Sequence, residues 1–197
     1  IEAAGYHLLR NEAYAPSNMV HSIYLALRAT PPEADVLIVY GDIAFEPRLV
    51  EAMLNSESEL VTAVDTAWHA YWRLRFDGTV LEDLESLVLA PDGRIERLGA
   101  DTRDLAEVDG RYVGLTKIAA RAVPALREAI EGDGVPSNLS TTELLQRRID
   151  AGAPVYAALV QRGWFEVDSV ADRDLIERLH ENHALAPVCD LDALASW

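Results

Sequence analysis

Three continuous apolar runs are the strongest structural pattern along the chain. They cover residues 36–40 (VLIVY), 60–64 (LVTAV) and 153–160 (APVYAALV). Apolar side chains at successive positions are typical of strands that are buried on both faces, as in parallel sheets. Segments with helical spacing separate these runs, which predicts a mainly parallel sheet covered by helices. The predicted helices cover residues 19–28, 47–54, 122–131, 141–151 and 171–180.

From residue 71 the pattern changes to short alternating runs, which predicts a β-rich insertion. The Asp-Gly pairs at 77–78, 92–93 and 109–110 are strong turn signals and separate most of these runs. We expect one α/β domain over residues 1–197, without repeats or linkers. The expected short strands cover residues 72–76, 87–90, 94–98 and 112–117, with two more at 6–10 and 163–167.

Composition narrows the class of protein and its partners. Half of the 197 residues are hydrophobic, enough to close a core, and the net charge is −16. Such an acidic surface repels nucleic acid and anionic membranes, so we expect neither as a partner. An anionic substrate would then need a bridging metal ion. The single cysteine, Cys189, allows no internal disulfide, and the absence of a leader or long apolar segment predicts a cytoplasmic protein.

Two aspartates directly follow predicted strands. Asp42 comes after VLIVYG, and Asp168 comes after GWFEV. Ligands of open α/β sheets bind beyond the carboxyl ends of the strands, where a partly desolvated acid favours a cation. The alternative is that each aspartate caps the helix that follows it. Together the two carboxylates could hold one Mg²⁺, a cation that takes carboxylates, waters and phosphate oxygens.

Six segments in order resemble the small cytidylyltransferases, which include phosphocholine and phosphonate cytidylyltransferases within the sugar-nucleotidyltransferase superfamily. The resemblance extends from Asn11 to Leu179. Its segments are NEAYAPSNMVHSIYLAL, VLIVYGDIAFEP, VDTAWHAYWRLRF, DGRYVGLTKIA, TTELLQRRIDAGAPV and GWFEVDSVADRDLIERL.

The resemblance implies a Rossmann-like sheet with a β-rich substrate-binding part. It implies that Asp42 and Asp168 are catalytic metal ligands for Mg²⁺, and that Ser17 and Asn18 face the nucleotide. It also implies the reaction, in which a phosphate or phosphonate oxygen of a small substrate attacks the α-phosphorus of CTP and pyrophosphate leaves. Positioning and charge neutralisation would dominate such catalysis.

Two departures from the family pattern stand out. The family opens with a strand and a Gly-rich, Arg-bearing loop that wraps the triphosphate, and no segment here has that form. We therefore expect that the N-terminal βα units are missing and that this chain alone is weakly active or inactive. At LGADT (98–102), relatives commonly carry lysines, whereas Ala100 and Asp101 supply no positive charge.

Candidate substrate-binding residues lie near the matched segments. Trp68 and Trp164 could hold a cationic head group by cation–π attraction, although large aromatic residues are commonly part of the core. Lys117 is a nearby cation that could contact the substrate. Arg73 and Arg75 alternate with apolar residues, a pattern that also fits solvent-facing side chains.

Three alternatives to a cytidylyltransferase stay open at this point. One is a uridylyl- or thymidylyltransferase that acts on a sugar 1-phosphate. Another is a non-catalytic ligand-binding paralogue, which the missing loop and Ala100 favour. A nucleotide-sugar glycosyltransferase would usually show an Asp-x-Asp pair, and residues 41–44 (GDIA) hold one acid. A homo-oligomer would cover apolar surface left bare by the missing units.

Overall fold

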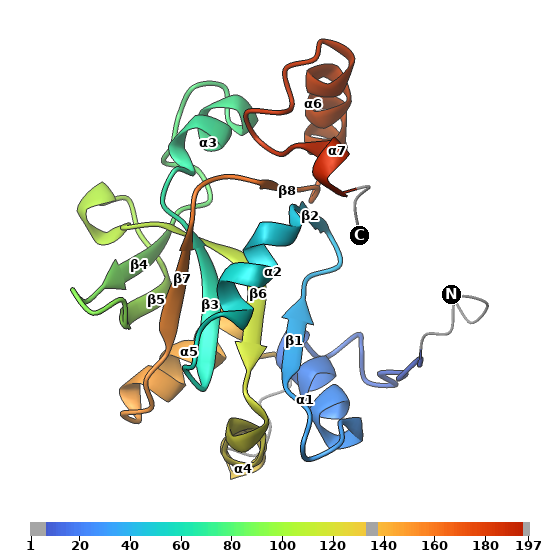
Figure 1. Ribbon diagram of the computed structural model, residues 1–197, viewed down its shortest axis with the longest axis vertical. Coiled ribbons are helices and arrows are strands. Elements are labelled where there is room, and N and C mark those ends of the chain that lie inside the picture. Colours follow the sequence, from blue (N-terminus) through green and yellow to red (C-terminus); the bar gives the residue numbers. More distant parts are fainter. Residues whose placement is uncertain (1–6, 133–137, 195–197) are drawn as a thin grey trace.

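A four-stranded sheet forms the centre of the computed structural model, which describes residues 7–132 and 138–194 (Figure 1). Strand β6 is antiparallel to its neighbours β1 and β3, while β3 and β7 are parallel. Three of the four strands therefore run in one direction. The predicted α/β class with a mostly parallel sheet is confirmed. In spatial order the strands are β1 (Val36–Val39), β6 (Arg111–Ile118), β3 (Leu60–Asp65) and β7 (Tyr156–Val160).

Two small antiparallel strand pairs flank this sheet. Strands β2 (Ile43–Phe45) and β8 (Trp164–Glu166) form one pair, and β4 (Glu85–Leu89) and β5 (Ile95–Asp101) form the other. The second pair is the predicted β-rich insertion. The helices are α1 (Met19–Ala29), α2 (Pro47–Leu54), α3 (His69–Arg75), α4 (Val123–Gly132), α5 (Thr141–Asp150), α6 (Val170–Glu181) and α7 (Leu191–Leu194).

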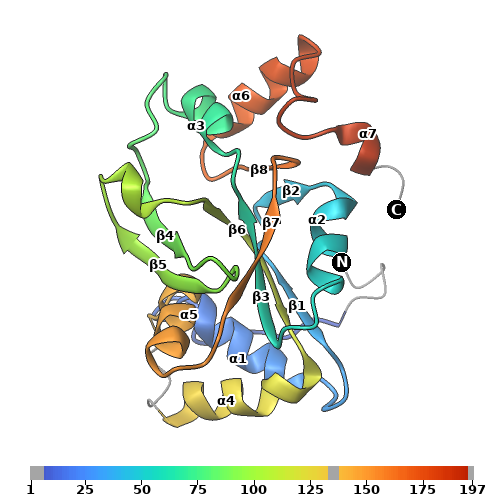
Figure 2. The same ribbon diagram turned by 60° about the vertical axis from the view of Figure 1, so that its left-hand side comes forward.

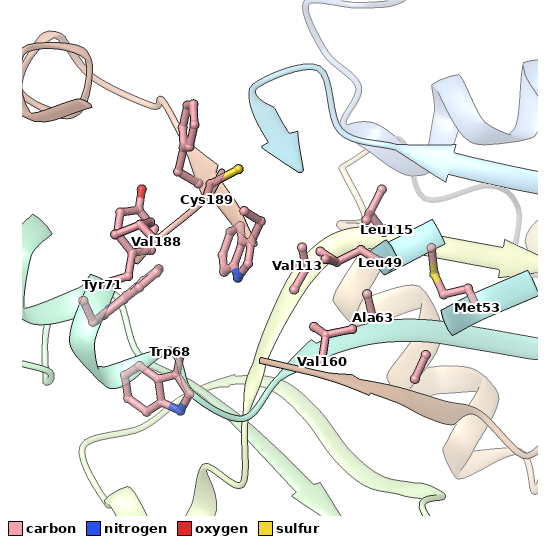
Figure 3. Close-up of a cluster of buried hydrophobic side chains, with 14 of the residues drawn as sticks. Leu49, Met53, Ala63, Trp68, Tyr71, Val113, Leu115, Val160, Val188 and Cys189 are labelled. Atoms are coloured by element: carbon pink, nitrogen blue, oxygen red, sulfur yellow. The ribbon is translucent and has the colours of Figure 1, made fainter. Parts of the chain in front are cut away.

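Side chains of β3 alternate between two hydrophobic clusters because successive residues of a strand point to opposite faces. Val61 and Ala63 pack in a cluster with residues of α2 and α3, part of which Figure 3 shows. Leu60 and Val64 pack in the other cluster with residues of α1, α4 and α5, which lie together beside the sheet in Figure 2. Helices thus cover both faces of the sheet.

Helices α1, α5 and α6 begin at residues whose side chains accept hydrogen bonds from free backbone N–H groups. Asn18 caps α1 through its side chain. Ser140 with Glu143, and Ser169 with Asp172, form complete capping boxes at α5 and α6.

Residues 72–76 do not form the expected strand, because most of them belong to helix α3. Trp68, Tyr71, Trp72 and Arg75 recur at helical spacing, and the three aromatic side chains are buried. The indole N–H of Trp72 donates to the carbonyl of Glu82 over 2.9 Å. Packing of these large side chains outweighs the alternation in WRLRF that suggested a strand.

Other strand predictions also need correction. Residues 112–117 lie in the central sheet as β6, not in the insertion. Residues 7–10 form no strand, and Tyr6 lies outside the described residues. Strand β1 is not buried on both faces. It is terminal among the described strands of its sheet, and Leu37 and Val39 are 37% and 44% exposed.

Strand β6 changes its register in the middle. Opposite β3, the pairing passes from Thr62 with Thr116 to Val64 with Tyr112, so β6 holds extra residues between these pairs. Gly114 lies there with φ at +83°, a backbone conformation that favours glycine. The bulge redirects the first residues of β6 toward the ends of β1 and β3.

Across the described part of the chain, none of the helices combines the length and apolar character needed to span a bilayer. Cys189 is buried in the cluster that contains α2 and α3, as Figure 3 shows, and burial raises the pKa of its thiol to about 12. Cys189 is therefore a core residue.

Candidate active site

A cleft of about 270 Å³ opens where β1 ends and β6 begins. Its walls come from the segments after β1 and β8, from β4 and β6, and from the starts of α1 and α5. Tyr40, Ser86, Tyr112, Ser140 and Thr142 contribute hydroxyl groups. The charged side chains that line it are those of Asp42, Asp83, Glu85, Arg111, Glu166 and Asp168.

Asp42 and Asp168 line this same cleft although 126 residues separate them (168 − 42). The pairing of β2 with β8 brings their segments together, and the amide of Val167 donates to the carbonyl of Asp42 over 2.9 Å. Neither aspartate is a helix cap, because Glu46 precedes α2 and Ser169 caps α6. The shared cleft supports their pairing; their role as metal ligands stays a prediction.

Asp168 has a partner that the sequence did not reveal. The guanidinium of Arg75 forms ion pairs with Glu166, Asp168 and Asp172, and its side chain is 5% exposed. Burial by itself would lower the pKa of Arg75, but Asp172 and Asp168 outweigh it and raise that pKa. Arg75 therefore holds two of the carboxylates that line the cleft, and it does not face solvent.

The loop before α6 is fixed from the other side by Asp172. This carboxylate accepts hydrogen bonds from the backbone N–H groups of Asp168 and Ser169 and from the Ser169 hydroxyl. Burial raises the pKa of Asp172, but hydrogen bonds from Arg75 and Ser169 lower it by more, so the net shift is downward. Asp172 thus stays ionised and anchors both the loop and Arg75.

The donor set fits a hard divalent cation that also binds phosphate. Among the described residues, no cluster of three or more Asp, Glu, His or Cys side chains could hold a metal. Mg²⁺ usually takes only one or two carboxylates and completes its shell with water and phosphate oxygens. No other described residue bonds the Asp42 carboxylate, and Asp168 engages Arg75 through Oδ2. Asp42 and Asp168 supply two carboxylates to one cleft, and Mg²⁺ bound by them stays a prediction.

Ser17 and Asn18 lie at the start of α1 but are not among the residues that line the cleft, whereas the next residue, Met19, is. The Asn18 side chain accepts from the Met19 amide and donates to the carbonyl of Asn138. The Ser17 hydroxyl accepts from Asn11. Their nucleotide contact stays a prediction.

Trp68, Trp164 and Lys117 have structural roles instead of the predicted substrate contacts. Trp68 and Trp164 are 0% and 1% exposed, and the Trp164 indole donates to buried Asp65. The Lys117 ammonium donates to the carbonyls of Met53 and Ser56 at the end of α2. None of the three lines the cleft, so we correct these assignments.

Sequence reasoning missed Arg75, Arg111 and Glu85 as residues of this region. Arg75 shares a helical face with Trp68 and Trp72, a signal that the strand assignment concealed. Arg111 directly follows the Asp-Gly pair at 109–110 and begins β6. Glu85 begins β4 and lines the cleft, and no local pattern in the sequence predicts that position.

Comparison with known proteins agrees with this fold. No family model matches the chain. The CTP:phosphoglutamine cytidylyltransferase of Campylobacter jejuni is 29% identical over 181 residues, which cover 86% of this chain and 71% of that protein. The inositol-1-phosphate CTP transferase from T. maritima has a similar structure, with a TM-score of 0.64, 18% identity and coverage of 87% of this chain. The CTP:phosphocholine cytidylyltransferase from Streptococcus pneumoniae gives a TM-score of 0.62, with 16% identity over 91% of this chain and 71% of that one.

The chain spans 65% of the T. maritima structure, so that relative is the longer protein. The chain therefore has the fold of these two CTP-dependent transferases. The resemblance to small CTP-dependent nucleotidyltransferases predicted from the sequence is confirmed.

Proposed function

We propose that the complete protein transfers CMP from CTP to a small phosphorylated or phosphonate substrate. An oxygen of the acceptor phosphate attacks the α-phosphorus of CTP, and a new P–O bond forms. The bond to the β-phosphate breaks, and its electron pair leaves with pyrophosphate. The curated relative, a CTP:phosphoglutamine cytidylyltransferase, supports CTP as the donor and a phosphorylated acceptor.

The observation that carries this proposal is the meeting of Asp42 and Asp168 in one cleft. They follow different strands, and in nucleotidyltransferase-like sheets this end of the strands is where ligands bind. Arg75 and Asp172 hold the Asp168 loop, so its carboxylate is positioned before substrate arrives. In a preorganised site, less of the binding energy of the substrate is needed to order the groups of the protein.

We propose that Asp42 and Asp168 hold Mg²⁺. When bound, the ion would neutralise charge on the α-phosphate and on the attacking oxygen. Among the described residues the cleft is lined by five carboxylates and by one guanidinium, that of Arg111. Without a bound cation, these carboxylates would repel a triphosphate.

The same imbalance suggests that further positive groups come from outside this chain. We propose that a segment preceding Ile1 supplies the loop that binds the triphosphate, and that residues 1–197 alone transfer CMP poorly. The backbone N–H groups and cationic side chains of such a loop bind phosphate oxygens that one metal ion cannot reach by itself. A cytoplasmic location and the absence of nucleic-acid partners stay predictions from the charge of the chain.

Release of pyrophosphate by the full-length protein tests the proposal. CTP, UTP, dTTP and ATP are each paired with phosphocholine, aminoethylphosphonate, a phosphoamino acid and glucose 1-phosphate. We expect release with CTP and a nitrogen-containing acceptor, and dependence on added Mg²⁺. Preference for UTP or dTTP with the sugar phosphate would support the alternative transferase, and no release with any pair would support a non-catalytic protein.

Asp42→Asn tests the role of the cleft in that reaction. We expect kcat to fall by roughly 100-fold or more with a small change in KM, because charge neutralisation matters most in the transition state. Asp174→Asn is the matched control, since Asp174 lies on α6, is 52% exposed and does not line the cleft. Equal rates for both variants would contradict the site.

A further inference from the structure

Glu85 and Arg111 line the cleft with opposite charges, yet they do not pair with each other. Glu85 begins β4 and is half-buried. Its carboxylate accepts no hydrogen bond and forms no ion pair within the described part of the chain. Desolvation is the largest influence on the Glu85 carboxyl and raises its pKa, while Arg111 lowers it. Glu85 is thus a partly dehydrated acid in a cleft.

Arg111 is the complementary group, and it is more deeply buried. Its side chain is 10% exposed, and its guanidinium lies 4.0 Å from the ring centre of Trp72. One Nη donates to the Asp83 carbonyl over 2.7 Å, and the other reaches the Asp83 carboxylate at 3.3 Å. Nε has no partner among the described residues. A guanidinium has five N–H donors, so most of its hydrogen-bonding capacity is unused.

An ionised Glu85 in this cleft is costly, because it has lost water without gaining a partner, while Arg111 keeps N–H donors free beside its contacts with Asp83. An ordinary stabilising ion pair would bring them into contact. A ligand that carries both charges can instead satisfy each of them, the cation at Glu85 and the anion at Arg111. The hydroxyls of Ser140 and Thr142 line the same cleft and offer further polar contacts.

We propose that the cleft binds an acceptor with an amino-acid head group, its ammonium at Glu85 and its carboxylate at Arg111. The inference rests on the proposed function, because the phosphate of the same molecule would face Asp42 and Asp168 across the cleft. A phosphorylated amino acid is thereby distinguished from phosphorylated alcohols and sugars. Specificity arises because a ligand without these groups leaves Glu85 without a partner and the remaining N–H donors of Arg111 unused.

Three probes separate the two contacts. Phosphoserine carries an ammonium and a carboxylate, phosphoethanolamine carries the ammonium alone, and glycerol 3-phosphate carries neither. Dissociation constants are measured by calorimetry with the full-length protein in the presence of Mg²⁺, and KM values are measured for CMP transfer. We expect phosphoserine to bind most tightly and glycerol 3-phosphate most weakly.

Glu85→Gln should weaken the binding of phosphoserine and phosphoethanolamine by about tenfold and leave glycerol 3-phosphate unchanged, because a charge-assisted contact is lost. Arg111→Lys should weaken phosphoserine alone. Glu96→Gln is the matched control for Glu85, since Glu96 is exposed on the neighbouring strand β5 and does not line this cleft.

The inference is overturned if Glu85→Gln changes all three probes equally, or if phosphoserine binds no more tightly than phosphoethanolamine. Neither result requires the Arg111→Lys variant, which could also disturb the local structure because Arg111 holds Asp83. Failure of the proposed function is a different result. In that case the probes bind in the expected order, but the unmodified protein transfers CMP to none of them.

Discussion

At the scale of single residues, Arg75 shows how a buried charge supports the site. Three carboxylates surround its guanidinium, and it also lies 5.2 Å from the ring centre of Trp72. Glu166 and Asp168 line the cleft, whereas Asp172 caps α6. One side chain therefore links helix α3, the cleft and helix α6.

Arg75→Gln should lower the free energy of unfolding by about 3–5 kcal/mol, because it leaves the buried Asp172 and the partly buried Glu166 without their partner. Arg73→Gln, two residues earlier on α3 and exposed, should change it by less than about 0.5 kcal/mol. Urea denaturation measures both. Equal losses would show that the ion pairs contribute no more than a surface charge.

Glu85 gives a stability prediction that depends on pH. Burial raises its pKa in the folded state, Arg111 opposes this, and Asp83, Asp101 and Glu143 add to it. The folded protein therefore binds the proton of Glu85 more tightly than the unfolded chain does. Stability is lost as the pH rises from the usual pKa of glutamate through the raised pKa of folded Glu85.

Glu85→Gln should raise the Tm at pH 7.5, because the charged form of Glu85 costs stability there. The difference should shrink as the pH falls through the raised pKa of folded Glu85 toward the usual value for glutamate, because Glu85 is then protonated and resembles glutamine. Thermal unfolding between pH 4 and 7.5, with Glu96→Gln as the control, measures this. A constant difference across that range would contradict the assigned cause.

At the scale of elements, the bulge in β6 shapes the cleft. Gly114 has φ at +83°, and an added Cβ would lie 2.9 Å from the ring of Tyr40. Tyr40 and Gly114 both line the cleft, and the Tyr40 amide donates to the Gly114 carbonyl. The close approach of β1 to β6 thus requires glycine at this position.

Gly114→Ala should lower the free energy of unfolding by more than about 1 kcal/mol, because alanine fits neither the backbone conformation nor the space. Gly132→Ala is the contrasting control. Gly132 ends α4, has open space around its Cα, and should tolerate alanine without loss or with a small gain. Chemical denaturation of both variants checks the prediction, and similar losses would contradict it.

At the scale of the whole molecule, a strongly acidic surface coexists with an unpaired strand edge. Beyond β1, no described strand continues the central sheet, and Leu37 and Val39 are exposed on it. Unpaired edges with apolar side chains promote strand pairing between molecules, whereas a net charge of −16 opposes it. Salt screens this repulsion.

We expect residues 1–197 to associate at high protein concentration, and more strongly as ionic strength rises. Val39→Lys should reduce association, because it places a charge on the β1 edge. Leu54→Lys is the control at an exposed leucine on α2. Sedimentation velocity measures the distribution. A monomer under all conditions would remove β1 as an interface.

The sequence by itself determined the order of the buried strands, most helices and the two aspartates that share the cleft. These follow from local rules, because apolar runs, helix caps and strand ends are visible in neighbouring residues. Tertiary structure alone decided that β6 enters the central sheet, that WRLRF is helical, and that Trp68, Trp164 and Lys117 are core residues. It also brought Glu85 and Arg111 to the cleft and paired Arg75 with two carboxylates that line it. Their surroundings come from segments far apart in the chain, so long-range packing, rather than local spacing, sets the burial and charge of each group.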